Sequence, residues 1–182
     1  MIFLINILTI SRMILGGLIF LLLLSPQYYA LALILFIIAS ITDYFDGFLA
    51  RRTNSVSELG EVLDPIADKI LITFLLIGIS INLMSSYIGF ISAVIIAREI
   101  WVGALRDFNA RNKRSNMTKV TFLAKVKTTI QLFTISLYLF GLAIGNPLVI
   151  IFADIFLFMS LLVTFYTGFE YTLNTFSKDS TY

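Results

Sequence analysis

The sequence predicts an all-α membrane protein, a bundle of six transmembrane helices whose two termini both lie on the cytoplasmic side. Of the 182 residues, 59% are hydrophobic and only 13% are charged, and the mean hydropathy is +0.96. This composition is far more apolar than that of a soluble domain. Charged residues are absent from three long stretches, and the Lys and Arg residues cluster away from the middle of each stretch. These observations predict a single membrane domain that spans residues 1–182.

Each of the three uncharged stretches is typical of a helical hairpin. Residues 13–42, 70–97 and 128–153 are all longer than the roughly 20 residues that one membrane helix needs. Near its middle, each stretch has a break of turn-forming residues. The breaks are Ser25-Pro26-Gln27, Asn82 with Ser85-Ser86, and Gly141 through Gly145-Asn146-Pro147. With the flanking sequence, the six spans are expected near residues 8–25, 27–50, 60–82, 87–108, 121–144 and 147–172.

The basic residues indicate the orientation. Cytoplasmic loops of membrane proteins are enriched in Lys and Arg, and all 13 of these residues fall on or near the side opposite the three breaks. We therefore expect that side to face the cytoplasm. An even number of spans brings both termini to it. Helices also satisfy every backbone hydrogen bond within lipid, and the helix-length pattern fits them better than the short alternating segments of a membrane barrel.

Composition excludes several kinds of chemistry. The chain has no cysteine and no histidine, which excludes disulfides, thiolate nucleophiles, Cys/His zinc sites and histidine acid–base catalysis. The net charge of +2 is too small to indicate nucleic-acid binding through a bulk field. Any catalysis therefore depends on carboxylates, Lys, Arg, Tyr or a bound metal.

Four acids interrupt otherwise apolar helices. Asp43 and Asp46 are three residues apart, and Asp64 and Asp68 are four apart, so each pair shares one face of its helix. Ionised carboxylates are costly in a membrane unless they are paired or bind cations. All-oxygen ligands favour a hard cation, so we expect these four residues to hold Mg²⁺, or Mn²⁺. Such an ion usually takes its remaining ligands from water and substrate phosphate.

Structural roles are the alternative for these residues. Arg51, Arg52 and Lys69 are near enough in sequence to neutralise some of the acids. Small residues on the same two helices, Gly47, Ala50 and Gly60, allow either close helix contact or a slot for a nucleotide.

The complete pattern resembles the signature of the CDP-alcohol phosphotransferase family. It reads Asp43-x-x-Asp46-Gly47-x-x-Ala50-Arg51, then eight residues, then Gly60-x-x-x-Asp64-x-x-x-Asp68. The resemblance implies six transmembrane helices, commonly in a homodimer, and an active site open to the cytoplasm. It implies that Asp43, Asp46 and Asp64 chiefly hold the metals and that Asp68 is the catalytic base. It also implies a nucleotide site formed by Asp46, Gly47, Ala50, Arg51 and Gly60.

Within this family, residues 6–12, 43–69, 97–106 and 125–131 resemble the bacterial phosphatidylglycerophosphate synthases. That resemblance implies CDP-diacylglycerol and sn-glycerol 3-phosphate as substrates and the bacterial plasma membrane as the location. The acceptor phosphate needs fixed cations, for which the candidates are Arg98, Arg106, Lys125 and Lys127. Arg98 and Arg106 have a structural alternative, which is pairing with Glu99 and Asp107. Thr9 and Arg12 are further candidates for nucleotide contact, with anchoring of the end of this first segment as the structural alternative.

Other functions remain open at this point. The same chemistry with phosphatidylglycerol or inositol phosphate as the acceptor would share the four aspartates. An intramembrane prenyltransferase also binds a diphosphate through aspartates and magnesium. A divalent-cation transporter would need polar groups that reach toward the opposite face.

Overall fold

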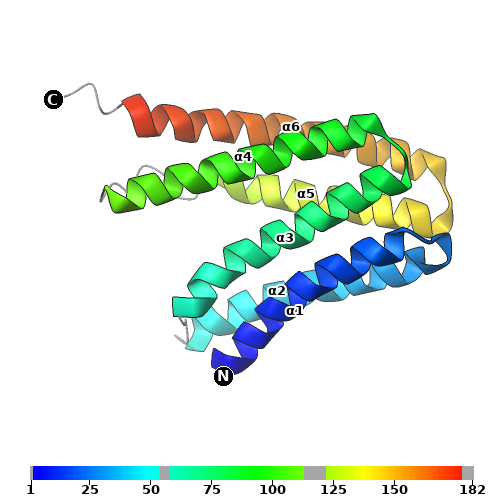
Figure 1. The fold of residues 1–182 in the computed structure, drawn as a ribbon, viewed down its shortest axis with the longest axis horizontal. Coiled ribbons are helices and arrows are strands. Elements are labelled where there is room, and N and C mark those ends of the chain that lie inside the picture. The colour runs from blue at the N-terminus through cyan, green and yellow to red at the C-terminus, as the bar shows by residue number, and fades with distance from the viewer. Residues whose placement is uncertain (1, 54–57, 113–121, 178–182) are drawn as a thin grey trace.

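The computed structural model describes residues 2–53, 58–112 and 122–177, with the backbone alone at residues 2–6, 43–53, 58, 59, 61, 62, 122, 124 and 125. The described residues form six long helices and one short 3-10 helix, and they contain no strand (Figure 1). The elements are α1 (Ile2–Leu23), η1 (Pro26–Tyr28), α2 (Tyr29–Thr53), α3 (Glu58–Asn82), α4 (Ser86–Arg111), α5 (Phe122–Ile144) and α6 (Pro147–Phe176). The all-helical prediction is confirmed.

The turns between paired helices coincide with the predicted breaks. Ser85 caps α4, because its Oγ accepts a hydrogen bond from the backbone N–H of Ile88 at 3.3 Å. Asn146 caps α6 in the same way, and Gly145 adopts a φ of +64° that glycine tolerates without strain. One part of the prediction is wrong. Gly141 lies inside α5, packed so closely that an added Cβ would stand 2.7 Å from the Ile150 side chain.

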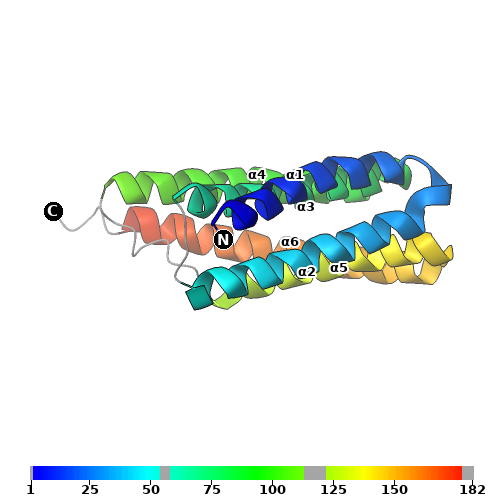
Figure 2. The ribbon, with the colours of Figure 1, turned by 90° about the horizontal axis from the view of Figure 1, so that it is seen from below.

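The three hairpin tips lie together at one end of the bundle, and the start of α1 and the end of α6 lie toward the other (Figures 1 and 2). Asn82 joins two of the tips, since its Nδ2 donates 2.6 Å hydrogen bonds to the Leu23 carbonyl and to the Tyr29 hydroxyl. From the tip end, α3 and α4 diverge toward the termini (Figure 1). Hydrogen bonds therefore join two of the tips at one end of the bundle, and α3 and α4 separate toward the other end.

Helices α4 and α6 run parallel and touch along their length. Their contacts progress together, from Tyr87 with Asp154 through Arg98 with Thr167 to Asn109 with Thr175. On the opposite side of the bundle, α1 packs on α3. Gly16 allows this close approach, because an added Cβ would stand 3.1 Å from the Leu71 backbone.

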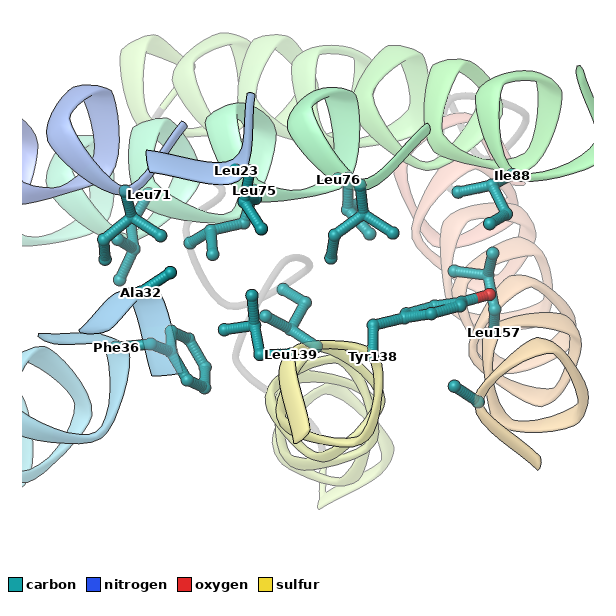
Figure 3. Close-up of a cluster of buried hydrophobic side chains, with 14 of the residues drawn as sticks. Leu23, Ala32, Phe36, Leu71, Leu75, Leu76, Ile88, Tyr138, Leu139 and Leu157 are labelled. Carbon is teal, nitrogen blue, oxygen red and sulfur yellow. The ribbon is translucent and has the colours of Figure 1, made fainter. Parts of the chain in front are cut away.

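The hydrophobic core fills the half of the bundle next to the tips. Leucine, isoleucine, alanine and aromatic side chains from all six long helices meet there, and Figure 3 shows them closing the space between α3 above and α5 below. Tyr138 is fully buried, and its hydroxyl donates a 2.6 Å hydrogen bond to Asp154. Asp154 therefore completes a polar contact beside this core.

The outer surface is apolar. Large side chains such as Phe90, Ile100 and Phe165 are each more than 60% exposed. Within the described residues, three helical segments are long and apolar enough to cross a membrane: Ser86–Arg111, Val126–Ile144 and Pro147–Phe176. A water-soluble protein rarely exposes apolar patches of this extent, so these helices indicate a membrane protein.

Candidate functional site

Two of the predicted carboxylates stand on one face of α3. Asp64 and Asp68 are one helical turn apart, and their side chains are 49% and 43% exposed. Both are contacted from α1. Thr9 Oγ1 donates a 2.7 Å hydrogen bond to Asp64 Oδ1, and Arg12 Nη1 donates a 2.8 Å hydrogen bond to Asp68 Oδ1. The second Arg12 nitrogen lies 3.6 Å from Asp64 Oδ1. These contacts fix the two carboxylates relative to α1.

Arg12 was a candidate for nucleotide contact, but its pairing with Asp64 and Asp68 was not predicted. Its side chain is only 1% exposed, and a buried guanidinium needs a counter-ion. Its position three residues after Thr9 on an apolar helix was the available signal, because a charge inside a membrane segment needs a partner. Thr9 was predicted to contact nucleotide, and the structure places it beside Asp64.

The rest of the predicted metal and nucleotide site is described only in part. Asp43, Asp46, Gly47, Ala50 and Arg51 lie on α2, and their side chains are outside the described residues. Gly60 is buried on α3. Among the side chains that are described, no group of three or more Asp, Glu, His or Cys residues gathers as a metal site would require. Asp64 and Asp68 are the described pair from the four predicted ligands.

A polar cavity of about 190 Å³ opens between α3, α4 and α5. This volume equals the liquid volume of roughly six water molecules. Asp68 lies in its wall, and so do three of the four predicted acceptor-binding residues, Arg98, Arg106 and Lys127, which we call the cation cluster. The side chain of the fourth, Lys125, is outside the described residues. The remaining lining residues are Pro65, Lys69, Ile72, Thr73, Ile95, Ile96, Glu99, Thr128 and Gln131.

Glu99 joins two members of the cation cluster. Its Oε1 forms an ion pair with Lys127 Nζ and lies 3.1 Å from Arg98 Nη1. The side chains of Arg98 and Lys127 are each 9% exposed, and that of Glu99 is 21% exposed. The predicted alternative of an Arg98–Glu99 pair is therefore present. The predicted alternative for Arg106, a pair with Asp107, is not seen among the described residues. Asp107 instead pairs with Arg111 at 2.8 Å.

The cation cluster retains unused hydrogen-bonding capacity. The Nε atoms of Arg98 and Arg106 are buried and receive no partner from the described residues. Four cations line the cavity, namely the cluster and Lys69, against the two acids Asp68 and Glu99. The lining therefore carries an excess of positive charge, which favours an anionic ligand with a carboxylate on the far wall.

Helix α6 supports the cluster from behind. Thr167 Oγ1 accepts a 2.6 Å hydrogen bond from Arg98 Nη2. The guanidinium carbons of Arg98 and Arg106 lie 6.0 Å and 5.5 Å from the centre of the Tyr171 ring. No residue of α6 was predicted to belong to the site, because threonine and tyrosine on an apolar helix are indistinguishable by pattern from packing residues.

Comparison with known sequences places the chain in a family. Residues 3–166 match the profile of the CDP-alcohol phosphatidyltransferases. The chain belongs to this enzyme family. The resemblance seen in the sequence is thereby confirmed.

Bacterial members of the CDP-alcohol phosphatidyltransferase family are similar over much of the chain. The CDP-diacylglycerol–glycerol-3-phosphate 3-phosphatidyltransferase of Rickettsia bellii is 39% identical over 149 residues, which are 81% of this chain and 80% of that protein. The enzyme of the same name from Sodalis glossinidius is 33% identical over 138 residues, 76% of this chain and 74% of that protein. The one from Escherichia coli K12 is 38% identical over 105 residues, and this match spans 58% of each chain.

Proposed function

We propose that this protein transfers the phosphatidyl group of CDP-diacylglycerol to sn-glycerol 3-phosphate, giving phosphatidylglycerophosphate and CMP. The observation that carries the proposal is the polar cavity, in which the carboxylate of Asp68 and the cation cluster line the same small space. A phosphorylated alcohol needs both features, cations for its phosphate and a base for its hydroxyl. The names of the similar bacterial enzymes specify the same two substrates.

The acceptor would bind with its phosphate on Arg98, Arg106 and Lys127. Arginine donates paired hydrogen bonds to phosphate oxygens and lysine adds a mobile point charge. On binding, the phosphate replaces part of the interaction that Glu99 makes with Arg98 and Lys127. The acceptor hydroxyl then points toward Asp68 across the cavity. Lys125 is proposed as a further phosphate contact.

Asp68 is proposed as the general base. It accepts the proton of the acceptor hydroxyl as the hydroxyl oxygen attacks the lipid-side phosphorus, the bond to CMP breaks, and CMP leaves with the electron pair. Arg12 holds Oδ1 of Asp68 at 2.8 Å, which fixes the carboxylate relative to α1. Positioning of this kind lowers the activation barrier, because the reacting groups are already held in the orientation that the reaction needs.

The donor set on α3 suits a divalent metal, because Asp64 and Asp68 present carboxylates on one half-exposed face. The family depends on divalent metal, and we propose Mg²⁺, or Mn²⁺, held by Asp43, Asp46, Asp64 and Asp68. When bound, the metal neutralises charge on the diphosphate. Gly47, Ala50 and Gly60 would leave room for the nucleotide, and Asp46, Arg51 and Thr9 would contact it.

The membrane arrangement is part of the proposal. We place six spans in the bacterial plasma membrane, with both termini and the polar cavity on the cytoplasmic side, in a homodimer of single-domain chains (1–182). The grouping of the three tips at one end of the bundle supports this arrangement (Figures 1 and 2). So does the apolar outer surface, which suits contact with membrane lipids.

The decisive experiment is an acceptor panel. Purified protein in detergent receives CDP-diacylglycerol and Mg²⁺ together with glycerol 3-phosphate, phosphatidylglycerol or inositol phosphate, and CMP release is measured. We expect release with glycerol 3-phosphate. Release with only one of the other two acceptors would assign the protein to cardiolipin or phosphatidylinositol phosphate synthesis instead.

A further inference from the structure

Three residues of α6 form a support behind the polar cavity. Thr167, Gly168 and Tyr171, which we call the arginine platform, lie against the two arginines of the cation cluster. None of the three lines the cavity. Each makes a different kind of contact with an arginine side chain.

The platform holds Arg98 at three points. Thr167 accepts a hydrogen bond from Nη2 at 2.6 Å. Gly168 lets the arginine stem lie flat on α6, because a Cβ there would stand 3.0 Å from Nε and 3.1 Å from Cγ. Tyr171 places its ring 6.0 Å from the guanidinium carbon. An arginine side chain has many rotamers, and these contacts select one of them.

Tyr171 also faces the second arginine. The Arg106 guanidinium carbon lies 5.5 Å from the centre of the same ring, within the distance at which the negative face of an aromatic ring attracts a cation. The ring is 1% exposed and packs with Val102 and Leu105 of α4, so it has little freedom to move. One rigid ring therefore attracts two guanidinium groups that would otherwise repel each other.

We propose that the arginine platform positions Arg98 and Arg106 for the acceptor phosphate, with Tyr171 as the central positioning residue. The inference rests on the proposed function, because it takes the acceptor phosphate as the ligand of the cation cluster. Two arginines held in place before the ligand arrives lose less side-chain entropy on binding. The platform therefore sets the affinity for the acceptor and leaves the donor and the chemical step unaffected.

The test compares variants by steady-state CMP release from the full chain in detergent. Tyr171→Leu removes the ring, and we expect the KM for glycerol 3-phosphate to rise roughly tenfold, equivalent to about 1.4 kcal/mol. The kcat and the KM for CDP-diacylglycerol should change less than about twofold. Tyr171→Phe keeps the ring and should retain the acceptor KM. Tyr166→Leu is the matched control, because Tyr166 lies on the same helix with a 62% exposed side chain.

A double variant separates positioning from general loosening. In an Arg106→Gln background, Tyr171→Leu should raise the acceptor KM less than it does in the wild type, because one of the two cations on which the ring acts is gone. Additive effects would overturn the proposal. So would an unchanged acceptor KM in Tyr171→Leu, an equal rise in both substrate KM values, or a Tyr171→Phe variant that behaves like Tyr171→Leu.

Thr167→Val provides a second route if Tyr171→Leu does not fold. It removes the acceptor of the 2.6 Å hydrogen bond while keeping the shape of the side chain, and an unchanged acceptor KM would overturn the proposal.

Failure of the proposed function can be distinguished from failure of this inference, because it appears as wild-type protein that releases no CMP with glycerol 3-phosphate. In that case, protection against thermal unfolding by inorganic phosphate still tests the platform. Wild-type protein should be protected more than Thr167→Val, and equal protection would overturn the inference.

Discussion

Neutralising Glu99 tests how the polar cavity is held together before the acceptor binds. Among the described residues, Glu99 is the only carboxylate in ion-pair contact with Arg98 or Lys127, whose side chains are each 9% exposed. Glu99→Gln keeps the shape but leaves both cations without a counter-ion. Removing one partner of a buried ion pair costs about 3–5 kcal/mol. We expect about 3 kcal/mol, because a cavity with room for roughly six waters offsets part of the loss.

Thermal unfolding in detergent measures this effect. For a chain of this size, about 1 kcal/mol corresponds to roughly 2–4 °C in Tm, so Glu99→Gln should unfold about 6–12 °C below the wild type. Glycerol 3-phosphate at about 100 times its Kd contributes roughly 2.7 kcal/mol, which restores most of the deficit. At one fixed concentration the variant should gain more than the wild type, because the phosphate no longer competes with Glu99 for Arg98 and Lys127.

Asp107→Asn is the matched control for this prediction. It also neutralises an acid of α4 that pairs with an arginine, but Asp107 and Arg111 are 61% and 78% exposed. An exposed pair of this kind contributes only about 0.3–0.5 kcal/mol, so the control should unfold within about 2 °C of the wild type. A Glu99→Gln variant that behaves like the control would refute the reasoning. Destabilisation that glycerol 3-phosphate fails to reverse would refute the link to anion binding.

Three more predictions concern catalysis, metal and the hairpin tips. Asp68→Asn should lower CMP release by about 10²-fold or more, because it removes the proposed base, while binding of CDP-diacylglycerol persists; full turnover would contradict the assignment. Chelation with EDTA should abolish CMP release and added Mg²⁺ should restore it, whereas activity that survives chelation would exclude the proposed metal. Asn82→Leu removes two 2.6 Å hydrogen bonds between tips and should cost about 1–3 kcal/mol of stability. Both KM values should stay unchanged, and a shift in either would show that the tips influence the cavity.

Local signals in the sequence predicted the helices and most of their ends. The Ser-Pro, Asn and Gly-Asn-Pro breaks mark the three tips because these residues cap helices or adopt turn conformations. Gly141 was misassigned to a turn. A lone glycine four residues before a stronger turn signal serves instead for close packing against Val149 and Ile150.

The placement of two candidate carboxylates on one face of α3 could be predicted from the pattern of that helix alone, and contacts between helices could not. The spacing of Asp64 and Asp68 is sufficient to place them on one face. Their contacts with Arg12 join residues that are 52 and 56 positions apart in the sequence. Helical periodicity predicts which residues share a face of one helix, but it does not predict which other helix packs against that face. Tyr171 was missed for the same reason, since its role depends on packing between α4 and α6.

The parallel pairing of α4 and α6 has a consequence for biosynthesis. Arg98 leaves the ribosome 69 residues before the Thr167 that accepts its hydrogen bond, and an unaccompanied arginine is costly to insert into lipid. Glu99, its immediate neighbour in the sequence, supplies the opposite charge during that interval. A nascent chain that stops before residue 147 holds every cation of the cavity and none of the α6 residues behind them. The cavity therefore gains its contacts with α6 only when this last helix docks.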